Sequence, residues 1–511
     1  MEHILTILLL VPIVGAVVTA ALPKDSARPF GIAVGAIELV LSLIALYYFD
    51  SSTGKFQFIE LYPIIPDYGM NYFVAVDGFS IYLMILAIFV TLICLVGIEQ
   101  LKHMEKMIVT LLLMEATMIG FFISLDAILF YILFEVSLVP MLYIIGAWGG
   151  EKRIYASMKF FIYTFSGSMI MLVGILYLGV KFHEATGVWS FSMLDWYFLV
   201  LPFDIQFWLF LAFYAGFAVK MPIFPFHTWL PHAHGQAPTV GSVILAAVLL
   251  KMGASYGFLR FSFPIMPDAS IYFMPVMAAF SLIMVIYGSL LAFAQSDIKQ
   301  VIAYSSIAHM GVVMLGLFSM NVEGFTGSVF LMFSHGIVSG GLFLLVGVIY
   351  ERMHTKDMSQ FGGIAKVMPK YALLFAIFTM ANVSLPLTIG FVGEFLCLVG
   401  YYKTSPWMTA AAGLLIITSA VYMLNIMRRT FYGPIINEKV AALKDLNKRE
   451  LLAIVPLAAL VIILGVYPKP ILQAAESSST NLLAWMLKKA SPENKLIIMQ
   501  ANIPNNQGAE K

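Results

Sequence analysis

Four charged residues lie inside stretches that are otherwise apolar. Glu135 lies in LDAILFYILFEVSLVPMLYII, Lys220 lies in FWLFLAFYAGFAVKMPIFPFHTWLP, and Lys251 lies at the centre of TVGSVILAAVLLKMGASYGFL. Glu394 follows a break that contains Pro386. A charge at the centre of a bilayer costs roughly 2.5–3.5 kcal/mol on insertion scales, so it persists mainly where it serves a pathway. The four charges therefore predict a chain that moves protons or other ions.

Glu135 and Lys220 have opposite charges and are predicted to control each other's protonation. A nearby ammonium group keeps a glutamate ionised, and removing that charge frees the lysine to release its proton. The two residues together predict a proton switch. The alternative is that Glu135 is a protonated structural residue bonded to a neighbouring helix.

Lys220 and Glu394 each lie beside a proline-containing break. Lys220 precedes Pro222, so it lies near the C-terminus of a half-helix, where a cation is favoured. Glu394 lies near the N-terminus of the half-helix after its break, where an anion is favoured. A simple capping role is the alternative for both. Burial favours the neutral form of Lys251, which we interpret as a buried titratable group rather than a static ion pair.

Histidines add further titratable groups in or beside the apolar stretches, namely His227, His232, His234, His309 and His335. Because imidazole exchanges protons near neutral pH, His309 and His335 in consecutive apolar runs are candidates for a relay. Hydrogen-bonded core residues are the alternative, and the lysines and glutamates around them disfavour haem ligation. The run HTWLPHAH contains no carboxylate to complete a metal site.

Three further acidic residues have more local interpretations. Glu115, in IVTLLLMEATMIGFF, either extends the polar line toward Glu135 or contacts a neighbouring subunit. Asp77 and Asp297 most simply cap the helices that follow them.

The sequence around these residues is that of a polytopic membrane protein. The chain has 511 residues, is 61% hydrophobic and 11% charged, and has a mean hydropathy of +0.92. No soluble fold needs so much apolar sequence. Apolar runs of about 20 residues predict an all-α protein with fourteen transmembrane helices. The predicted spans are residues 3–21, 30–48, 79–98, 107–125, 127–148, 156–180, 206–230, 239–260, 271–294, 299–319, 324–350, 371–402, 407–427 and 451–468.

One membrane domain is predicted over residues 1–470, followed by an extramembrane tail over 471–511 whose end is disordered. The seventh and twelfth spans are long and broken. Interrupted helices at corresponding places in two halves are typical of transporters built from inverted repeats. We therefore predict two inverted five-helix repeats, over about 107–260 and about 271–427. The polar and aromatic segment 49–77 is expected to form an extramembrane loop or hairpin.

Basic residues are distributed unevenly between the predicted loops. The loops after odd-numbered spans hold 17 lysines and arginines, and the opposite loops hold 4. Because cytoplasmic loops carry the excess of basic residues, both termini are expected on the non-cytoplasmic side. The N-terminal apolar run has no basic region before it, which favours a first span over a cleaved signal peptide.

Sequence motifs for nucleotides and redox cofactors are absent. The chain has no GxxxxGK[ST] loop and no GxGxxG turn, which disfavours ATP-driven transport and an NAD or flavin site. Its two cysteines, Cys94 and Cys397, cannot supply a four-thiolate iron–sulfur cluster. The driving energy is therefore expected from an ion gradient or from a partner that does the redox chemistry.

Five segments combine charged, histidine and proline residues in a specific pattern. They are FEVSLVPMLYIIGAWGG with Arg153 and Lys159 after it, KFFIYT, AVKMPIFPFHTWLPHAH with GQAPTVGSVILAAVLLKMGASYG, SDIKQVIAYSSIAHMG, and LPLTIGFVGEFL. Over nearly its whole length the chain resembles the antiporter-like proton-channel subunits of respiratory complex I. Glu394 favours the M type (chain 4), because the L and N types and the large sodium/proton antiporter subunits have a lysine there.

The resemblance implies roles for the charged residues. Glu135 resembles the fifth-helix glutamate that modulates the lysine of the broken seventh helix, which Lys220 resembles. Lys251 resembles the central lysine of the eighth helix. The remaining matches are His309 and His335 with the histidines of the central hydrophilic axis, and Glu394 with the exit residue of the twelfth helix.

One position departs from the family pattern. Relatives usually read HTWLPDAH, whereas this chain has His232 at the aspartate position. The change is either a tolerated loop substitution or one that alters proton entry from the cytoplasm. His227 and His232 are therefore secondary candidates for the proton path, as is Glu115.

The resemblance also implies a setting for the chain. It would be a subunit of a proton-pumping NADH:quinone oxidoreductase in an inner, energy-transducing membrane. Its partners would be L-, N- and K-type membrane subunits, a peripheral redox arm and lipid, with no nucleic acid. Flavin, iron–sulfur clusters and quinone would belong to partner subunits, and this chain would hold no cofactor. Two other classes stay open, a cation/proton antiporter subunit and the equivalent subunit of a membrane-bound hydrogenase-type complex.

Overall fold

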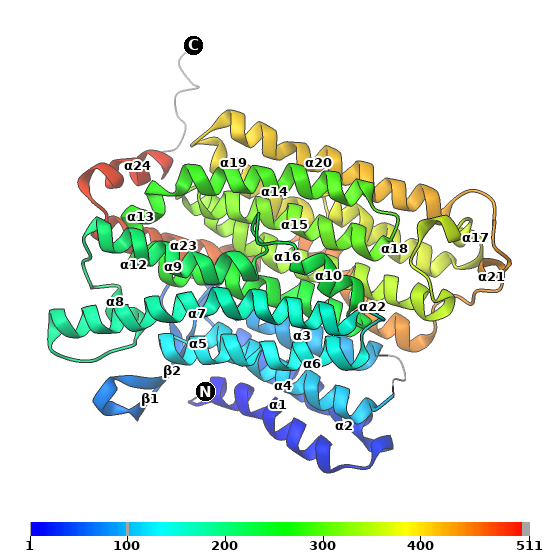
Figure 1. Cartoon of the computed structure of the whole chain (residues 1–511), viewed down its shortest axis with the longest axis horizontal. Coiled ribbons are helices and arrows are strands. Elements are labelled where there is room, and N and C mark those ends of the chain that lie inside the picture. The colour runs from blue at the N-terminus through cyan, green and yellow to red at the C-terminus, as the bar shows by residue number, and fades with distance from the viewer. Residues whose placement is uncertain (1, 99–101, 503–511) are drawn as a thin grey trace.

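The computed structural model describes residues 2–98 and 102–502, and most of them lie in helices along one common direction (Figure 1). Among the described residues, 11 helices are long and apolar enough to cross a membrane by length and composition. They are α1 (Ile4–Ala21), α2 (Lys24–Tyr48), α4 (Met104–Ile123), α5 with α6 (Ala127–Val136 and Leu138–Trp148), α7 (Arg153–Thr186), α9 (Phe203–Lys220), α14 (Met274–Ala294), α15 (Ile298–Leu317), α16 (Val322–Met353), α20 with η6 (Pro406–Ile426 and Met427–Phe431) and α22 (Lys448–Val466).

Three shorter apolar helices accompany these 11. They are α3 (Ile81–Gly97), α11 with the π-helical turn η2 (Thr239–Ile244 and Leu245–Leu249), and α19 (Ile389–Tyr402). The fourteen predicted spans draw on both groups of helices. How many of them cross a bilayer stays a prediction.

The remaining elements are short or connect the long helices. They are η1 (Pro66–Tyr68), α8 (Met193–Trp196), α10 (Trp229–Gln236), η3 (Met252–Tyr256), η4 (Phe258–Ser262), α12 (Phe263–Ile265), α13 (Pro267–Tyr272), η5 (Met358–Gln360), α17 (Ile364–Val367), α18 (Pro369–Asn382), α21 (Glu438–Ala441), α23 (Lys469–Lys489) and α24 (Pro492–Asn502). The segment expected to form a loop or hairpin contains an antiparallel pair, β1 (Gln57–Ile65) and β2 (Met70–Val76), with Leu61 opposite Phe73.

Helix α16 forms the centre of the bundle. Its sequence is apolar on every side and rich in small residues, as in SHGIVSGGLF, so neighbouring helices pack closely around it. It contacts α3, α15, α18, α19, α22 and α23. Its most apolar stretch of 18 residues is completely buried. Helices α1, α2 and α7 lie outside this core and leave many apolar side chains exposed.

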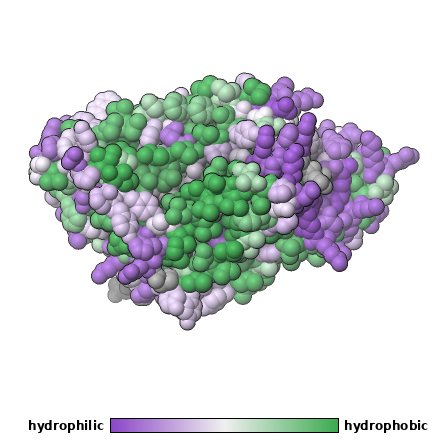
Figure 2. Space-filling model, turned by 90° about the horizontal axis from the view of Figure 1, so that it is seen from below, coloured by the Kyte–Doolittle hydropathy of each residue, from purple (hydrophilic) through white to green (hydrophobic). Residues whose placement is uncertain are grey.

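The polarity of the surface changes along the direction of the helices. Figure 2 shows a broad apolar area across the middle of the face seen from below, with hydrophilic residues gathered toward the right end. In Figure 1 the right end carries α17 and α21, and the left end carries the β hairpin, α8 and α24. An apolar zone between two polar ends is the surface expected of a membrane protein.

The C-terminal segment has more structure than the sequence indicates. The predicted tail over 471–511 contains most of α23, which packs against α16, and all of α24. Helix α23 turns Ile471, Leu482 and Met486 into the core, so its apolar face explains its order. The predicted disorder at the end of the tail concerns residues 503–511, which lie outside the described residues.

Both predicted breaks are present. Helix α9 ends at Lys220, before Pro222 and Pro225, and helical structure resumes at α10. Helix α18 ends at Asn382 and α19 begins at Ile389. Proline removes a backbone donor and clashes with the preceding turn, which stops both helices where the sequence predicts.

Candidate functional site

Lys251 and His335 meet at the centre of the bundle. Lys251 is completely buried between two π-helical turns, η2 and η3, and His335 lies on α16. The Lys251 Nζ atom lies 2.7 Å from His335 Nδ1, and it also donates a hydrogen bond to the carbonyl oxygen of Ala246. Turns of π-helix are rare and occur mostly at functional sites. The contact joins an amine to an imidazole, two groups that can exchange a proton.

His309 and Glu394 form the next contact along the same line. The His309 Nδ1 atom on α15 lies 2.6 Å from Glu394 Oε1 on α19, and both side chains are buried. The rings of His309 and His335 are tilted against each other, with their centroids 5.8 Å apart. Lys251, His335, His309 and Glu394 therefore form one continuous row of titratable groups, which we name the central row.

A small cavity lies beside the central row. It has a volume of about 10 Å³ and is bordered by both histidines, Glu394, Asn382 and Ser384. The Nε2 atoms of His309 and His335, Asn382 Oδ1 and Ser384 Oγ are all buried and have no hydrogen-bond partner among the described residues. Buried polar groups without a partner are costly, and a polar cavity of this size can hold one water molecule that bonds to several of them. The cavity therefore offers a route around the gap between the two rings.

The broken twelfth helix places Glu394 in this row. Glu394 lies in the second turn of α19, and the last residue of α18 is Asn382. Ser384 and Leu387 in the break adopt positive φ angles of 59° and 71°. Such angles are unfavourable for residues with side chains and cluster at functional sites. The break thus turns Asn382 and Ser384 toward the cavity that Glu394 borders.

Lys220 contacts the chain close to Glu135. Lys220 is the last residue of α9, and its Nζ atom donates to Ser137 Oγ at 3.3 Å and lies 4.5 Å from the centroid of the Phe134 ring. The charges of Glu135 and Lys220 act on each other, but their side chains form no ion pair within 4.0 Å in the described chain. Lys220 therefore bonds to Ser137, two residues after Glu135 at the junction of α5 and α6, and not to the carboxylate itself.

Lys220 and the Lys251 helix are in close contact. A Cβ atom at Gly253, in η3, would overlap the Cβ and Cγ atoms of Lys220. The absence of a side chain at this position lets the aliphatic stem of Lys220 pack directly against the helix that carries Lys251. The geometry brings the seventh and eighth predicted spans together at their lysines.

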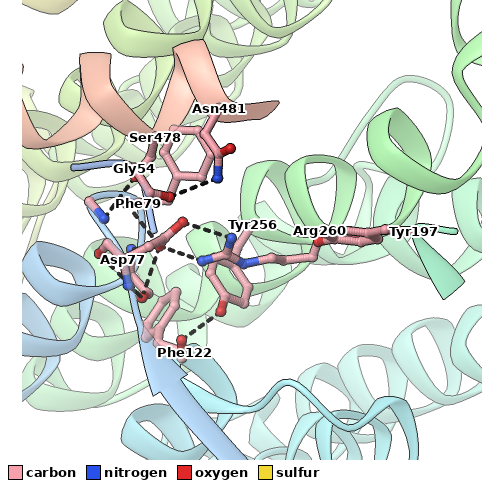
Figure 3. Close-up of polar contacts among 11 residues, drawn as sticks. Gly54, Asp77, Phe79, Phe122, Tyr197, Tyr256, Arg260, Ser478 and Asn481 are labelled. Carbon is pink, nitrogen blue, oxygen red and sulfur yellow. Dashed lines mark hydrogen bonds and ion pairs between the residues drawn. The ribbon is translucent and has the colours of Figure 1, made fainter. Parts of the chain in front are cut away.

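A buried ion pair fixes the far end of the Lys251 helix. Arg260, in η4, donates to both carboxylate oxygens of Asp77, one of them at 2.8 Å, and its guanidinium lies 4.7 Å from the Tyr256 ring centroid. Asp77 also accepts from the backbone N–H groups of Phe79 and Ser80, as expected of a cap. Figure 3 shows the carboxylate lying between these donors and the guanidinium.

Helix α23 closes the same region from the C-terminal side. Ser478 Oγ accepts a hydrogen bond from the backbone N–H of Gly78 at 2.9 Å. Asn481 donates to the carbonyl oxygen of Gly54 at 2.8 Å, as Figure 3 also shows. The hairpin, α3, η4 and α23 are therefore linked by polar contacts around Arg260.

A larger cavity opens at the other end of the Lys251 helix. It has a volume of about 180 Å³ and is bordered by Lys299, Glu351, Lys356 and the residues that connect α10 to α11. Lys299 Nζ donates to the carbonyl oxygen of Ala237 at 2.6 Å, and Lys356 Nζ donates to that of Gly235 at 3.1 Å. Polar side chains therefore line the cavity beside the start of the helix that carries Lys251.

His234 lies directly before this connection. It is completely buried, its ring stacks on Phe343 with centroids 4.6 Å apart, and neither ring nitrogen has a partner within the chain. The charges of Lys251 and Lys299 both act on it. His234 is therefore influenced both by Lys299, which borders the cavity, and by Lys251 of the central row.

The secondary candidates have other surroundings. The buried His227 ring packs against Phe224 and Tyr287, with centroids 5.7 and 5.5 Å away. His232 is exposed, and its ring lies edge-on to Tyr155. No contact described in the structure joins either residue to the central row.

Glu115 lies beside a second buried acid. It lies on α4 and faces Glu38 of α2. Sequence analysis missed Glu38, and also Ser137, Asn382 and Arg260 as parts of the site. Glu38 is a carboxylate inside an apolar run, and this signal could have identified it.

Three comparisons with known proteins show which family the chain resembles. Residues 124–419 match the family model described as NADH:quinone oxidoreductase/Mrp antiporter, TM. The chain is 46% identical over 456 residues to NADH-quinone oxidoreductase subunit M of Rickettsia conorii, covering 88% of this chain and 92% of the relative. It is similar in structure to a chain of respiratory complex I from Thermus thermophilus with bound NADH, with a TM-score of 0.86, 30% identity, and coverage of 94% of this chain and 99% of that chain.

A chain of the Mrp complex from Dietzia sp. DQ12-45-1b has the same fold, with a TM-score of 0.80, 17% identity, and coverage of 98% of this chain and 100% of that chain. At this identity the likeness concerns the fold alone. The family model covers more than half of the chain, and the Rickettsia relative covers more than two thirds of it. The chain therefore belongs to the family of NADH-quinone oxidoreductase M subunits.

Proposed function

We propose that this chain is the proton-translocating, antiporter-like subunit of a membrane-bound NADH:quinone oxidoreductase. The observation that supports the proposal is the central row. In it Lys251, His335, His309 and Glu394 follow one another in space, beside the two broken helices. Proton transfer needs donors and acceptors within hydrogen-bond reach, and the two outer contacts of the row are 2.7 and 2.6 Å long.

The proton path follows from the order of the groups. Protons enter from the cavity bordered by Lys299 and pass His234 to reach Lys251. They then move through His335 and His309, with the small cavity bridging the rings, to Glu394. Each group is titratable and shielded from bulk water, which is the arrangement expected of an intramembrane relay.

Glu135 and Lys220 act as the switch of this path. When Lys220 is charged it repels a proton on Lys251, since the stem of Lys220 packs against Gly253, two residues after Lys251. Moving charge away from Glu135 weakens the hold on the Lys220 proton. Ser137, two residues after Glu135, accepts the hydrogen bond of the Lys220 ammonium group.

The setting of the chain is part of the same proposal. The chain has fourteen spans in one membrane domain over residues 1–470, with two inverted five-helix repeats over about 107–260 and 271–427. It lies in an inner, energy-transducing membrane with both termini on the non-cytoplasmic side. Its partners are the neighbouring L-, N- and K-type subunits, and a peripheral arm holds the flavin, iron–sulfur clusters and quinone site.

Substitution of Lys251 tests the proposal. In the purified complex reconstituted into vesicles, Lys251→Met is expected to lower the rate of NADH-driven proton translocation roughly tenfold or more, because proton-transfer groups contribute about 10²–10⁴-fold. NADH oxidation by a water-soluble artificial acceptor should stay unchanged. The matched control is Lys181→Met, at an exposed lysine paired with Glu184.

Two outcomes would contradict the proposed function or its proton path. Undiminished pumping by the Lys251→Met complex would remove the central row from the proton path. Sodium-dependent transport without NADH oxidation, or copurification with hydrogenase subunits, would favour one of the alternative classes instead.

A further inference from the structure

Glu38 and Glu115 form a second group of buried acids, apart from the central row. Glu38 lies on α2 and Glu115 on α4, and both residues are 0% exposed. Helices α2 and α4 pack against each other, and the charge of Glu38 acts on the carboxyl group of Glu115. None of the four carboxyl oxygens has a hydrogen-bond partner in the described chain.

Close packing of α2 against its neighbours brings the two acids together. Gly31 and Gly35 lie seven and three residues before Glu38, on the same side of the helix. A Cβ atom at Gly31 would overlap Ile108 of α4, and one at Gly35 would press on Leu92 of α3. Small residues at these positions let the helix backbones approach, which leaves no room for solvent around the carboxyl groups.

No cation in the described part of the chain bonds to either acid. The nearest basic residue to Glu38 on α2 is Arg28, about 15 Å away along the helix axis, and the nearest to Glu115 on α4 is Lys106, about 13.5 Å away, at 1.5 Å per residue. Helix α1, which packs on both, contains no titratable residue, and α3 contributes only Tyr82 and Cys94.

The other elements packed against α4 also lack a counter-ion. Helices α5 and α6, strand β2 and η3 contribute Tyr131, Glu135, Tyr143, Tyr72 and Tyr256. Among these groups, the charge of Glu115 acts on the Cys94 thiol.

Two carboxylates cannot both stay ionised in this position. Burying one unpaired charge in apolar surroundings is costly, and a second like charge in contact adds repulsion. Only a protonated carboxyl group can donate a hydrogen bond to its neighbour, because an ionised carboxylate only accepts. We propose that Glu38 and Glu115 form a proton-binding pair, separate from the central row, that holds at least one proton at neutral pH.

Infrared difference spectroscopy of the purified complex tests the pair directly. The Glu38→Gln/Glu115→Gln double variant is expected to lose at least one carboxyl equivalent of absorption from the protonated C=O stretch at neutral pH. The matched control, Glu184→Gln, removes an exposed carboxylate paired with Lys181 and should lose only ionised carboxylate bands. If the double variant also loses only ionised carboxylate bands, the proposal is overturned.

The single variants keep the test decisive. An amide can donate an N–H where the acid donates its O–H, so Glu38→Gln and Glu115→Gln are each expected to assemble. If the double variant does not assemble, the same spectra of Glu38→Gln and of Glu38→Asp, which withdraws the carboxyl from its partner, are compared with wild type. An unchanged protonated C=O absorption in both would overturn the proposal.

Proton pumping separates this site from the proposed function. Glu38→Gln is expected to leave the ratio of protons translocated to NADH oxidised unchanged, whereas Lys251→Met lowers it. A loss of protonated C=O absorption together with a lower ratio would place the pair on the pumping path, and would overturn its separation from the central row.

Discussion

At the scale of single residues, the central row gives each side chain one defined partner. Lys251 meets His335 and His309 meets Glu394, so each contact joins groups of different proton affinity. The Nε2 atoms of both histidines remain free of partners in the chain and border the small cavity. Each imidazole can therefore accept a proton on one nitrogen and release one from the other.

Asn382 and Ser384 are expected to assist the transfer between the two rings. Asn382→Leu fills the small cavity with an apolar side chain, and Ser384→Ala removes a hydroxyl that borders it. Each change should slow NADH-driven proton translocation in reconstituted vesicles roughly two- to tenfold, since about 1.4 kcal/mol on a barrier is a tenfold change in rate.

A serine elsewhere in the bundle provides the control for this prediction. Ser289 is buried on α14, and its hydroxyl bonds to the carbonyl oxygen of Val285 in its own helix at 2.7 Å. Ser289→Ala should leave the translocation rate at the wild-type value. Equal rates in Asn382→Leu and wild type would show that the cavity takes no part in the transfer.

At the scale of elements, the helix that carries Lys251 is distorted and held at both ends. The π-helical turns η2, η3 and η4 follow one another along it, with Lys251 between the first two. One end is fixed by the Arg260–Asp77 ion pair, and the other borders the large cavity. The structure thus positions the lysine from both sides while the helix itself departs from regular hydrogen bonding.

Removing one partner of the Arg260–Asp77 pair should destabilise the chain strongly. Both side chains are almost fully buried, and an uncompensated buried charge costs about 3–5 kcal/mol. Arg260→Met and Asp77→Leu, each made alone, are therefore expected to lower the thermal unfolding midpoint of the complex. The double variant, which buries no charge, should recover part of that loss.

The partly exposed pair between Lys403 and Glu323 is the matched comparison. Its two side chains are 15% and 38% exposed, and such pairs contribute about 0–1 kcal/mol. Lys403→Met should therefore change the unfolding midpoint little. A similar shift in Arg260→Met and Lys403→Met would mean that the buried pair does not hold the Lys251 helix.

At the scale of the whole molecule, the two polar ends differ in what they carry. One end in Figure 1 holds α17, α21 and the loops rich in lysine and arginine, and the other holds the β hairpin, α8 and α24. The large cavity beside Lys299 lies with the basic loops, since Lys356 and Gln236 border it. If basic loops face the cytoplasm, protons enter the chain from that side.

This orientation is expected to appear in labelling of single introduced cysteines. In sealed vesicles of known sidedness, a membrane-impermeant maleimide should modify Lys444→Cys from the cytoplasmic side and Lys55→Cys from the opposite side. The native Cys94 and Cys397 are buried and should react only after denaturation. Modification of both introduced cysteines from the same side would contradict the orientation and the predicted number of spans.

The sequence by itself determined the class of the protein and the candidate residues for its chemistry. Apolar runs, helix-breaking prolines and the cost of a buried charge act locally along the chain, so they can be recognised without knowing which helices meet. They predicted the helical membrane architecture, both breaks, the hairpin, and Lys251, His309, His335 and Glu394 as candidates.

Only the tertiary structure decided which of these residues are partners. Lys251 and His335 are 84 residues apart in sequence, and His309 and Glu394 are 85 apart. Their contacts depend on how α15, α16, α19 and the Lys251 helix pack, which periodicity does not encode. The same reason explains why the contact of Lys220 with Ser137, and the position of Glu38 near Glu115, emerged only when the helices were assembled.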